Sequence, residues 1–321
     1  MVSRLAGSHL SIDGLSVILD RVTLHPQAIA LNAQLVALPS YPLDTHYGQM
    51  RVSARELALA VTEHIRIEHI ADVDADGVGC RLYRPYDGAP VALYVHGGGW
   101  VLHDLETHEE FCRHLAKSSG WALLAVDYRR APEHPFPAPL DDVQTAGRWL
   151  RGHADKLGVD ASFVPGIGDS SGANLIAGLL VRDPRALDFQ VLIYPPVDAH
   201  SDTESMRTEG GPSLTIDGMA WFWAAYAPDD LGRNPEVSPL HAGNLAKHPP
   251  ALIVSAEHDI LRDQVEQYAA RLAEAGVEVD ARRALGMVHS FWRQPAVFDA
   301  SRALVRDVRG ALNAARAERS T

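Results

Sequence analysis

At 321 residues with 46% hydrophobic side chains, the chain is long enough to bury a core, as one large domain or two smaller ones, without disulfides or metals. Its formal net charge of −12 repels phosphate backbones and anionic lipid surfaces, which argues against nucleic acid and membranes as partners. Cys80 and Cys112 form no CxxC pair, so we expect free thiols in a reducing compartment. No apolar run reaches the ~18–20 residues that span a bilayer or resembles a secretory signal, and we expect a cytoplasmic protein.

The first elements in the chain are two helical stretches, at about 26–37 and 52–64, that have no neighbouring strand and must therefore cover another part of the molecule. After them, apolar and polar residues alternate at 65–67 and again at 78–82, which is the pattern of half-buried strands. An Asp-Gly pair between the two runs favours a tight turn. These residues predict an antiparallel hairpin at the edge of a sheet.

From about residue 90 onward, short apolar runs rich in β-branched residues alternate with amphipathic helical stretches. This alternation is typical of a mostly parallel sheet covered by helices, so we predict an α/β fold. The expected strands are 91–95, 121–126, 163–167, 191–194, 251–254 and a strand-like stretch at 277–284.

A long connection separates the strand that ends at Tyr194 from the strand that begins at Ala251, and insertions of this length usually carry function. Within it, a strongly aromatic helix face is predicted by residues at i, i+3, i+4 and i+7, which are Met219, Phe222, Trp223 and Tyr226. We therefore predict a helical cap made of residues 1–60 and an insertion at about 199–245. The catalytic domain is expected to span 61–321.

The segment GDSSG at 168–172 follows an expected strand and precedes a helical stretch. A serine in this strand–turn–helix setting, with glycines two positions before and after it, is typical of a nucleophile elbow, which makes Ser170 the candidate nucleophile. A glycine-rich turn without chemistry and a phosphate-binding loop are the alternative interpretations. The phosphate loop fits poorly, because the last glycine lies one position too late for a dinucleotide fingerprint and Asp169 would repel a pyrophosphate.

The run HGGGW at 96–100 comes directly after the strand expected at 91–95. Attack on an ester places a negative charge on the carbonyl oxygen, and a run of glycines lets backbone N–H groups point at that charge without obstruction by side chains. We predict the amides of Gly97, Gly98 and Ser171 as the donors of this oxyanion hole. The aromatic residues predicted to contact substrate are Trp100, Phe222, Trp223 and Tyr226.

A serine nucleophile needs a general base, and the chain has 16 histidines. In the fold with this type of elbow, the acid and then the histidine follow the nucleophile, each on a loop after a strand. His289 follows the strand-like stretch at 277–284, and Asp259 follows the strand at 251–254. Glu257 and Asp263 lie on the same loop as Asp259, and either is an alternative acid; we choose Asp259.

The spacing of His108, Cys112 and His114 gives one further candidate cluster, because residues four apart share a helix face. Glu109 and Glu110 lie between them and favour a solvated helix face instead. We therefore predict no metal and no cofactor.

Six motifs in this order make the chain similar to the hormone-sensitive lipase-like family of microbial carboxylesterases, of the α/β-hydrolase superfamily. They are HGGGW at 96–100, DYRRAPEHPFPAPLDD at 127–142, GDSSGAN at 168–174, IYPPVD at 193–198, HDILRD at 258–263 and the turn around His289. The resemblance covers nearly the whole chain. It implies a central sheet of about eight strands with an antiparallel N-terminal edge, helices on both faces and a helical cap. It also implies Ser170, Asp259 and His289 as a triad, and a possible homodimer through the last strand of the sheet.

The resemblance further implies that Arg129, Glu133 and Asp142 support the oxyanion loop, although ordinary surface charges are an alternative. Three positions depart from the family pattern. Ser171 replaces the usual Ala after the nucleophile, Ile260 replaces the usual Pro after the acid, and His103 stands where Gly is common. A side chain at 103 is expected to narrow the alcohol side of the site.

Together these features predict a serine carboxylesterase that hydrolyses short- to medium-chain acyl esters through an acyl-enzyme intermediate. An amidase, or a deacetylase of carbohydrates or natural products, would use the same residues and is the nearest alternative. A non-catalytic ligand receptor is a more distant alternative, since such a receptor predicts a broken triad. The expected partner is a small-molecule ester.

Overall fold

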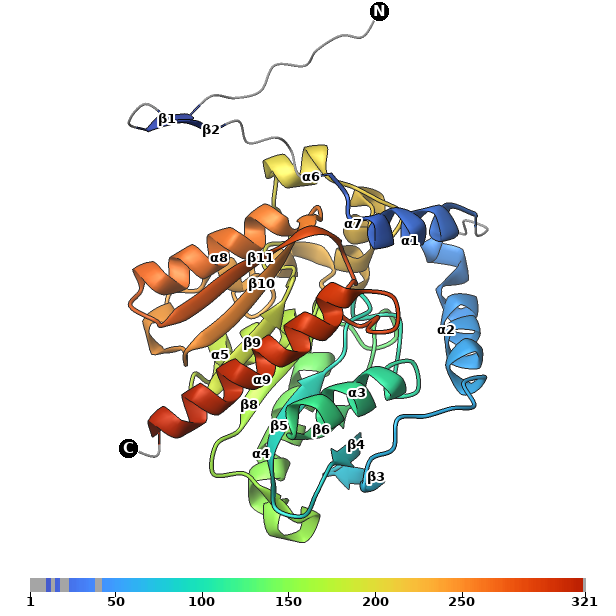
Figure 1. Ribbon diagram of the computed structural model, residues 1–321, viewed down its shortest axis with the longest axis vertical. Helices are drawn as coiled ribbons and strands as arrows, with labels where there is room; N and C mark the ends of the chain where they lie inside the picture. The colour runs from blue at the N-terminus through green and yellow to red at the C-terminus, as the bar shows by residue number, and fades with distance from the viewer. Residues whose placement is uncertain (1–9, 13–14, 18–22, 38–41, 320–321) are drawn as a thin grey trace, which may run out of the picture.

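The computed structural model describes residues 10–12, 15–17, 23–37 and 42–319 of the chain. Its main sheet is built from β3 (His69–Ala75), β4 (Val78–Arg84), β5 (Ala89–Val95), β6 (Ala122–Val126), β8 (Pro165–Asp169), β9 (Phe189–Ile193), β10 (Ala251–His258) and β11 (Val279–Val288). Their spatial order is β11-β10-β9-β8-β5-β6-β4-β3, and the short β7 (Val159–Asp160) pairs with β5 beside this path (Figure 1). Strands β5, β6, β8, β9, β10 and β11 run parallel to one another. β4 pairs antiparallel with β6, and β3 pairs antiparallel with β4. The predicted mostly parallel sheet with an antiparallel N-terminal edge is confirmed.

Helices cover both faces of this sheet. The face toward the viewer in Figure 1 carries α3 (Glu109–Ser119) and α9 (Asp299–Arg319), and the opposite face carries α4 (Ala138–Leu157) and α5 (Ser171–Arg182). The next crossover helix along the chain is α8 (Arg262–Glu274). On β5, Leu93 and Val95 pack into one buried cluster while Ala92 and Tyr94 pack into the other. The strand is therefore apolar throughout, because both of its faces are buried.

The N-terminal hairpin forms as expected, but it begins later in the chain. β3 starts at His69, so Ile65 and Ile67 belong to the extended segment before it. The turn between β3 and β4 is made by Asp76 and Gly77 with φ of 55° and 90°, which is the left-handed backbone that Asp-Gly turns favour.

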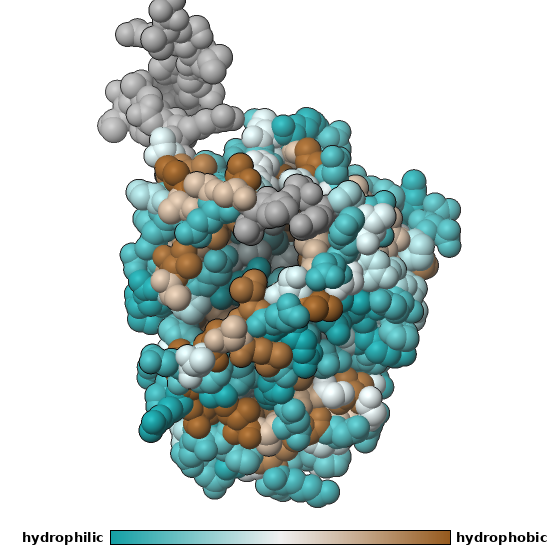
Figure 2. Space-filling model, turned by 90° about the vertical axis from the view of Figure 1, so that its right-hand side faces the viewer, coloured by the Kyte–Doolittle hydropathy of each residue, from teal (hydrophilic) through white to brown (hydrophobic). Residues whose placement is uncertain are grey.

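Two helices near the N-terminus lie beside the main body (Figure 1). The helix α1 (Pro26–Ala37) has the predicted bounds, whereas α2 (Leu43–Leu59) begins nine residues before and ends five residues before the predicted stretch at 52–64. A short antiparallel pair, β1 (Leu10–Ile12) and β2 (Leu15–Val17), precedes them and was not predicted. Figure 2 shows the side of the molecule that carries α2, where hydrophobic residues of α1 and α2 reach the surface.

No residue of α2 is buried, and polar contacts add to the packing of Leu43 and Tyr47 in attaching this helix to the body. The Arg51 guanidinium donates to the carbonyl of Val101 at 2.7 Å and to that of Ala131 at 2.6 Å, and it pairs with Glu133 at 2.7 Å. One turn later, Arg55 pairs with Asp104 at 2.9 Å. These contacts hold α2 against the loop that follows β5.

The long connection between β9 and β10 folds into α6 (Glu204–Thr208), α7 (Ile216–Tyr226) and the short 3-10 turns Asp229–Arg233, Pro239–His241 and Leu245–Lys247. α7 begins at Thr215, whose side-chain oxygen accepts a hydrogen bond from the N–H of Gly218 at 3.0 Å, a typical N-cap. Its buried residues are those of the predicted aromatic face, Met219, Phe222, Trp223 and Tyr226. Within the part of the chain that the structure describes, no helix is both long enough and apolar enough to cross a bilayer.

Candidate active site

Ser170 occupies a sharp turn between β8 and α5. Its φ of 50° and ψ of −125° are strained for a residue with a side chain. A Cβ on Gly168 would lie 2.6 Å from the backbone nitrogen of Ala173, and a Cβ on Gly172 would lie 2.0 Å from the carbonyl oxygen of Val95. Only glycine fits at these two positions, and the turn therefore holds Ser170 above the carboxyl end of the sheet.

His289 and Asp259 extend from Ser170 in a continuous hydrogen-bonded chain. Nε2 of His289 is 3.0 Å from Oγ of Ser170, and Nδ1 is 2.7 Å from Oδ2 of Asp259. His289 and Asp259 are both buried, and the ring of Tyr194 packs against His289 at 4.6 Å between centroids. The sequence-predicted triad residues are thus brought together with the separations that general-base activation of a serine requires.

The two alternative acids point elsewhere. Glu257 accepts a hydrogen bond from the N–H of Gly286 at 2.6 Å. Asp263 accepts from the N–H of Ser205 at 2.7 Å and pairs with Arg262 at 2.9 Å. Neither carboxylate contacts His289, so of these three acids it is Asp259 that is hydrogen-bonded to the ring.

The glycine run after β5 lies directly beside Ser170. Gly98 and Gly99 line the same cavity as the serine, with φ of 126° and 61°. Gly97 does not line that cavity, and its N–H donates to Oδ1 of Asp169 at 3.1 Å. The prediction that Gly97 donates to an oxyanion disagrees with this geometry, because its amide is already bonded. Gly98 and Gly99 are the glycines that face the site.

Ser171 is the first residue of α5 and is fully buried directly after the nucleophile. The first N–H groups of a helix have no partner within the helix and carry a partial positive charge. The amide of Ser171 is therefore suited to bind a developing negative charge, and its role in the oxyanion hole stays a prediction.

A cavity of about 440 Å³ opens over Ser170 and His289. Its apolar lining includes Leu31, Leu35, Met50, Leu102, Leu214, Met219 and Phe222. Of the aromatic residues predicted to contact substrate, Phe222 lines this cavity and also packs on Gly99, where a Cβ would lie 2.4 Å from the Phe222 ring.

The other three aromatic residues lie behind the cavity wall. Trp100 stacks on Tyr226 at 4.4 Å between centroids with 4° between planes, and Trp223 is also 4.4 Å from Trp100. All three are buried in the main core cluster. They pack α7 against the glycine loop, and in this structure these three predicted substrate contacts do not line the cavity over Ser170.

Three histidine rings form a buried cluster next to the glycine loop. The ring of His108 lies 5.2 Å from that of His96 and 5.4 Å from that of His103. Burial lowers the pKa of His96 to about 4 and holds the pKa of His103 and His108 well below the usual range. Near neutral pH all three are therefore uncharged, and in the described residues no group of His, Cys, Asp and Glu is arranged to hold a metal ion.

The residues implied as supports of the oxyanion loop form two separate contacts. Asp142 accepts hydrogen bonds from the Arg129 N–H at 2.8 Å and from the Arg129 guanidinium at 2.8 Å. Glu133 instead pairs with Arg51 of α2. The first contact ties the start of the loop between β6 and α4 to the first turn of α4, and the second ties that loop to α2.

Sequence reasoning missed two residues at the site. Asp169 anchors the glycine loop through Gly97 and also accepts a hydrogen bond from the Tyr94 hydroxyl at 2.9 Å. Arg293, four residues after His289, lines the cavity. The place of Asp169 beside the nucleophile was visible in the sequence, but the direction of its side chain was not.

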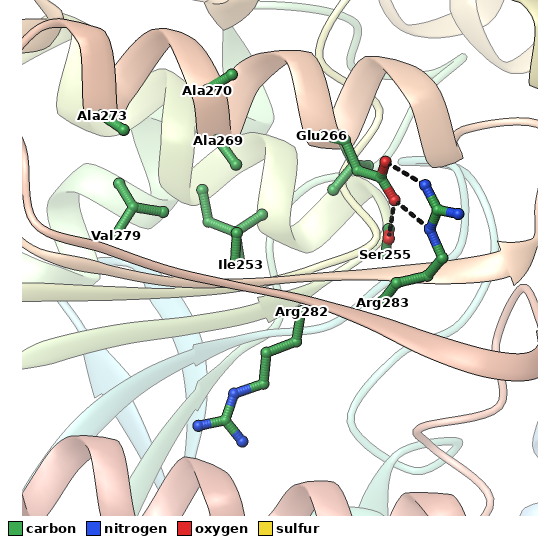
Figure 3. A pocket seen from close by; sticks show the side chains of 11 residues that line it. Ile253, Ser255, Glu266, Ala269, Ala270, Ala273, Val279, Arg282 and Arg283 are labelled. Carbon is green, nitrogen blue, oxygen red and sulfur yellow. Dashed lines mark hydrogen bonds and ion pairs between the residues drawn. The ribbon is translucent and has the colours of Figure 1, made fainter. Parts of the chain in front are cut away.

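A second hollow, of about 410 Å³, lies between α8 and the strands β10 and β11 (Figure 3). Ile253, Val279 and several alanines line it, while Glu266 at one end binds Arg283 and Ser255. It contains neither Ser170 nor His289, which both line the larger cavity described above.

Comparison with known proteins identifies relatives of the whole chain. A family profile described as alpha/beta hydrolase fold matches residues 92–293. The carboxylic ester hydrolase LipN of Mycobacterium tuberculosis is 36% identical over 299 residues, which covers 87% of this chain and 79% of that protein. An ethyl acetate hydrolase of Pseudomonas putida is 37% identical over 238 residues, covering 70% and 75%. A solved hyperthermophilic esterase from Pyrobaculum calidifontis aligns with a TM-score of 0.85 at 36% identity, covering 91% of this chain and 98% of that one.

Proposed function

The chain belongs to the alpha/beta hydrolase fold family, as one of its hormone-sensitive lipase-like carboxylesterases, and we propose that Ser170, His289 and Asp259 carry out its ester hydrolysis. The observation that carries this proposal is the chain of hydrogen bonds from Asp259 through His289 to Ser170, at 2.7 Å and 3.0 Å, inside an apolar cavity. The names of the relatives support the reaction class, and the geometry supports these residues as its agents.

In the acylation step, Oγ of Ser170 attacks the ester carbonyl carbon while Nε2 of His289 accepts the serine proton. Asp259 receives a hydrogen bond from Nδ1–H of the ring and stabilises the imidazolium that forms. Collapse of the tetrahedral intermediate breaks the bond to the alcohol, and His289 returns the proton to the leaving oxygen. Water then attacks the acyl-enzyme with His289 again as base, which releases the acid and restores Ser170.

For the oxyanion we propose the amides of Gly98, Gly99 and Ser171. This set replaces Gly97 by Gly99, because the Gly97 N–H is engaged by Asp169. Removing one such donor typically costs about 10²–10³ in kcat. The left-handed φ of Gly98 and Gly99 explains why residues with side chains are not suited to this loop.

We propose short- to medium-chain acyl esters as substrates. We also propose that residues 1–60 and 199–245 form the cap. Residues of α1, α2 and α7 close the cavity, which supports a limited acyl slot. Each methylene adds roughly 0.8 kcal/mol of binding while it is buried and nothing once the slot is full. A panel of 4-nitrophenyl esters should peak between acetate and octanoate, and a higher kcat/KM on palmitate than on butyrate would reject the slot.

The Ser170→Ala variant tests the nucleophile. It should abolish turnover of 4-nitrophenyl butyrate while its thermal unfolding stays close to that of the parent protein. The parent protein should release a burst of about one equivalent of 4-nitrophenol if the acyl-enzyme accumulates. Retention of substantial activity in the folded variant would overturn the assignment. Turnover of a matched amide at the rate of the ester would favour the amidase alternative.

We also propose a cytoplasmic location and a homodimer through the free edge of β11. β11 is the terminal strand of the sheet in the described residues, and exposed edge strands are ready to pair with another strand. Light scattering at micromolar concentration tests the dimer, and a monomeric mass there would reject it.

A further inference from the structure

One charged side chain in the catalytic cavity has no role in the steps above. Arg293 lines the cavity together with Ser170, His289 and Gln294. It is half-buried, and no carboxylate of the described residues lies within ion-pair distance of it. A guanidinium with five N–H donors is thus placed in a mostly apolar cavity without a protein anion to bind.

The backbone around Arg293 holds it firmly in place. The preceding residues, Phe291 and Trp292, are fully buried, and Trp292 packs edge-on against Phe111 at 4.6 Å between centroids. Gln294 donates to the carbonyl of Ser290 at 3.3 Å. The backbone of Arg293 is therefore carried by a packed turn that also carries His289.

The other ionisable groups in the cavity wall do not compete with it. Asp169 is 2% exposed and directs Oδ1 to the Tyr94 hydroxyl and the Gly97 N–H. His103 is uncharged near neutral pH because burial, reinforced by the positive charge of Arg293, holds its pKa well below the usual range. Among the described residues that line the cavity, Arg293 is the one arginine or lysine, and it is therefore a permanent cation that a substrate meets.

The charge of Arg293 also acts close to the nucleophile. Burial raises the pKa of Asp169, next to Ser170, and Arg293 is the strongest charge that opposes this rise. It likewise adds to the effect of burial in lowering the pKa of His103 beside the glycine loop. Arg293 therefore lies close enough to influence both Asp169 and His103, which line the same cavity.

We propose that Arg293 selects esters that carry a free carboxylate, which it binds through charge-assisted hydrogen bonds while Ser170 attacks the ester group. The proposal rests on the ester hydrolysis proposed above and names a substrate class for that site. A planar carboxylate matches the forked guanidinium, and an apolar cavity around the pair strengthens their attraction. Half-esters of dicarboxylic acids, and hydroxy acids acylated on their hydroxyl group, have this chemistry.

Two matched substrate pairs test the proposal, one for each side of the ester. The acyl pair is mono-4-nitrophenyl adipate and the 4-nitrophenyl ester of adipic acid monoamide, in which a neutral amide replaces the carboxylate. The alcohol pair is the butyrate ester of 4-hydroxybenzoate and that of 4-hydroxybenzamide. For each pair, the ratio of kcat/KM for the anionic ester to that for the neutral ester is measured at pH 7.5 in the parent protein and in Arg293→Gln, Arg293→Lys and Arg306→Gln.

Arg293→Gln is expected to lower the ratio by about 10- to 100-fold in at least one pair, the usual effect of losing a charge-assisted hydrogen bond. Arg293→Lys should restore part of the ratio, since it keeps the charge without the fork. Arg306 is exposed on α9, and its variant should leave the ratio unchanged. Turnover of the neutral esters reports on Ser170 chemistry separately. Equal ratios in the parent protein and Arg293→Gln, for both pairs, would overturn the selection of carboxylates while leaving ester hydrolysis intact.

Discussion

Replacing Asp259 by Asn removes the charge beside His289 while preserving the shape of the side chain. Asp259 accepts two hydrogen bonds, from Nδ1 of His289 at 2.7 Å and from the N–H of Leu261 at 3.0 Å. An amide has a single oxygen, so Asn satisfies only one of these donors. If its NH₂ group faces the ring, Nε2 of His289 carries a proton and cannot accept one from Ser170. If the NH₂ group faces Leu261, two donors meet in a buried site.

Both arrangements remove the negative charge that stabilises the imidazolium of His289. We expect kcat to fall by about 10³–10⁴-fold, which corresponds to about 4–5 kcal/mol of transition-state stabilisation. The unsatisfied donor should also lower the free energy of unfolding by about 1–3 kcal/mol. The two losses differ in size, so they can be distinguished experimentally.

The assay compares kcat on 4-nitrophenyl butyrate and urea unfolding for Asp259→Asn and Asp263→Asn. Asp263 lies four residues away and binds Ser205 and Arg262, so its variant removes the same charge without touching His289. It should lose less than about tenfold in kcat. Equal losses in the two folded variants would refute the assignment of Asp259.

Three further changes are predicted. His103→Gly, at a φ of 67° that suits glycine, should widen the cavity beside Gly98. The kcat/KM for tert-butyl acetate, divided by that for ethyl acetate, should rise by about tenfold, and an unchanged ratio contradicts this. The folded-state pKa of His96, about 4, lies below its unfolded value of about 6.5, so His96 contributes stability above pH 6.5 that is lost as the pH falls toward 4. This loss should be about 3 kcal/mol, and equal resistance to urea unfolding at pH 7 and pH 4 would exclude it. Gly152→Ala in α4, where an added Cβ meets nothing within 4 Å, should stabilise the protein by about 1 kcal/mol. Gly172→Ala should destabilise it by at least about 2 kcal/mol in the same urea-unfolding assay, and the opposite order of stabilities would reject the packing argument.

The elbow could be predicted because its requirements are local in the sequence. Gly168 and Gly172 are each needed by a backbone contact within or beside the turn, so their spacing around Ser170 marks the geometry. The sheet was equally readable, since strands buried on both faces are continuous apolar runs. The boundaries of α2 were not readable, because a helix without buried residues has no apolar stripe to mark its ends.

What the sequence could not supply is the direction in which side chains and amides point. The Gly97 N–H is taken by Asp169, which lies 72 residues later in the chain. The aromatic spacing in α7 marks a buried face, but Phe222 faces the cavity while Trp223 and Tyr226 pack on Trp100. Both outcomes depend on contacts between distant segments, and local spacing carries no information about them.

The polar attachment of α2 has a consequence for how this protein can acquire new substrates. Met50 of α2 lines the cavity, and no residue of that helix is buried, although Leu43 and Tyr47 pack against the edge of the hydrophobic core. Substitutions along α2 therefore change one wall of the cavity with little effect on folding, provided that Arg51 and Arg55 keep their partners. Evolution by drift, or a directed library in the laboratory, can vary this helix while the sheet and the reacting groups stay constant.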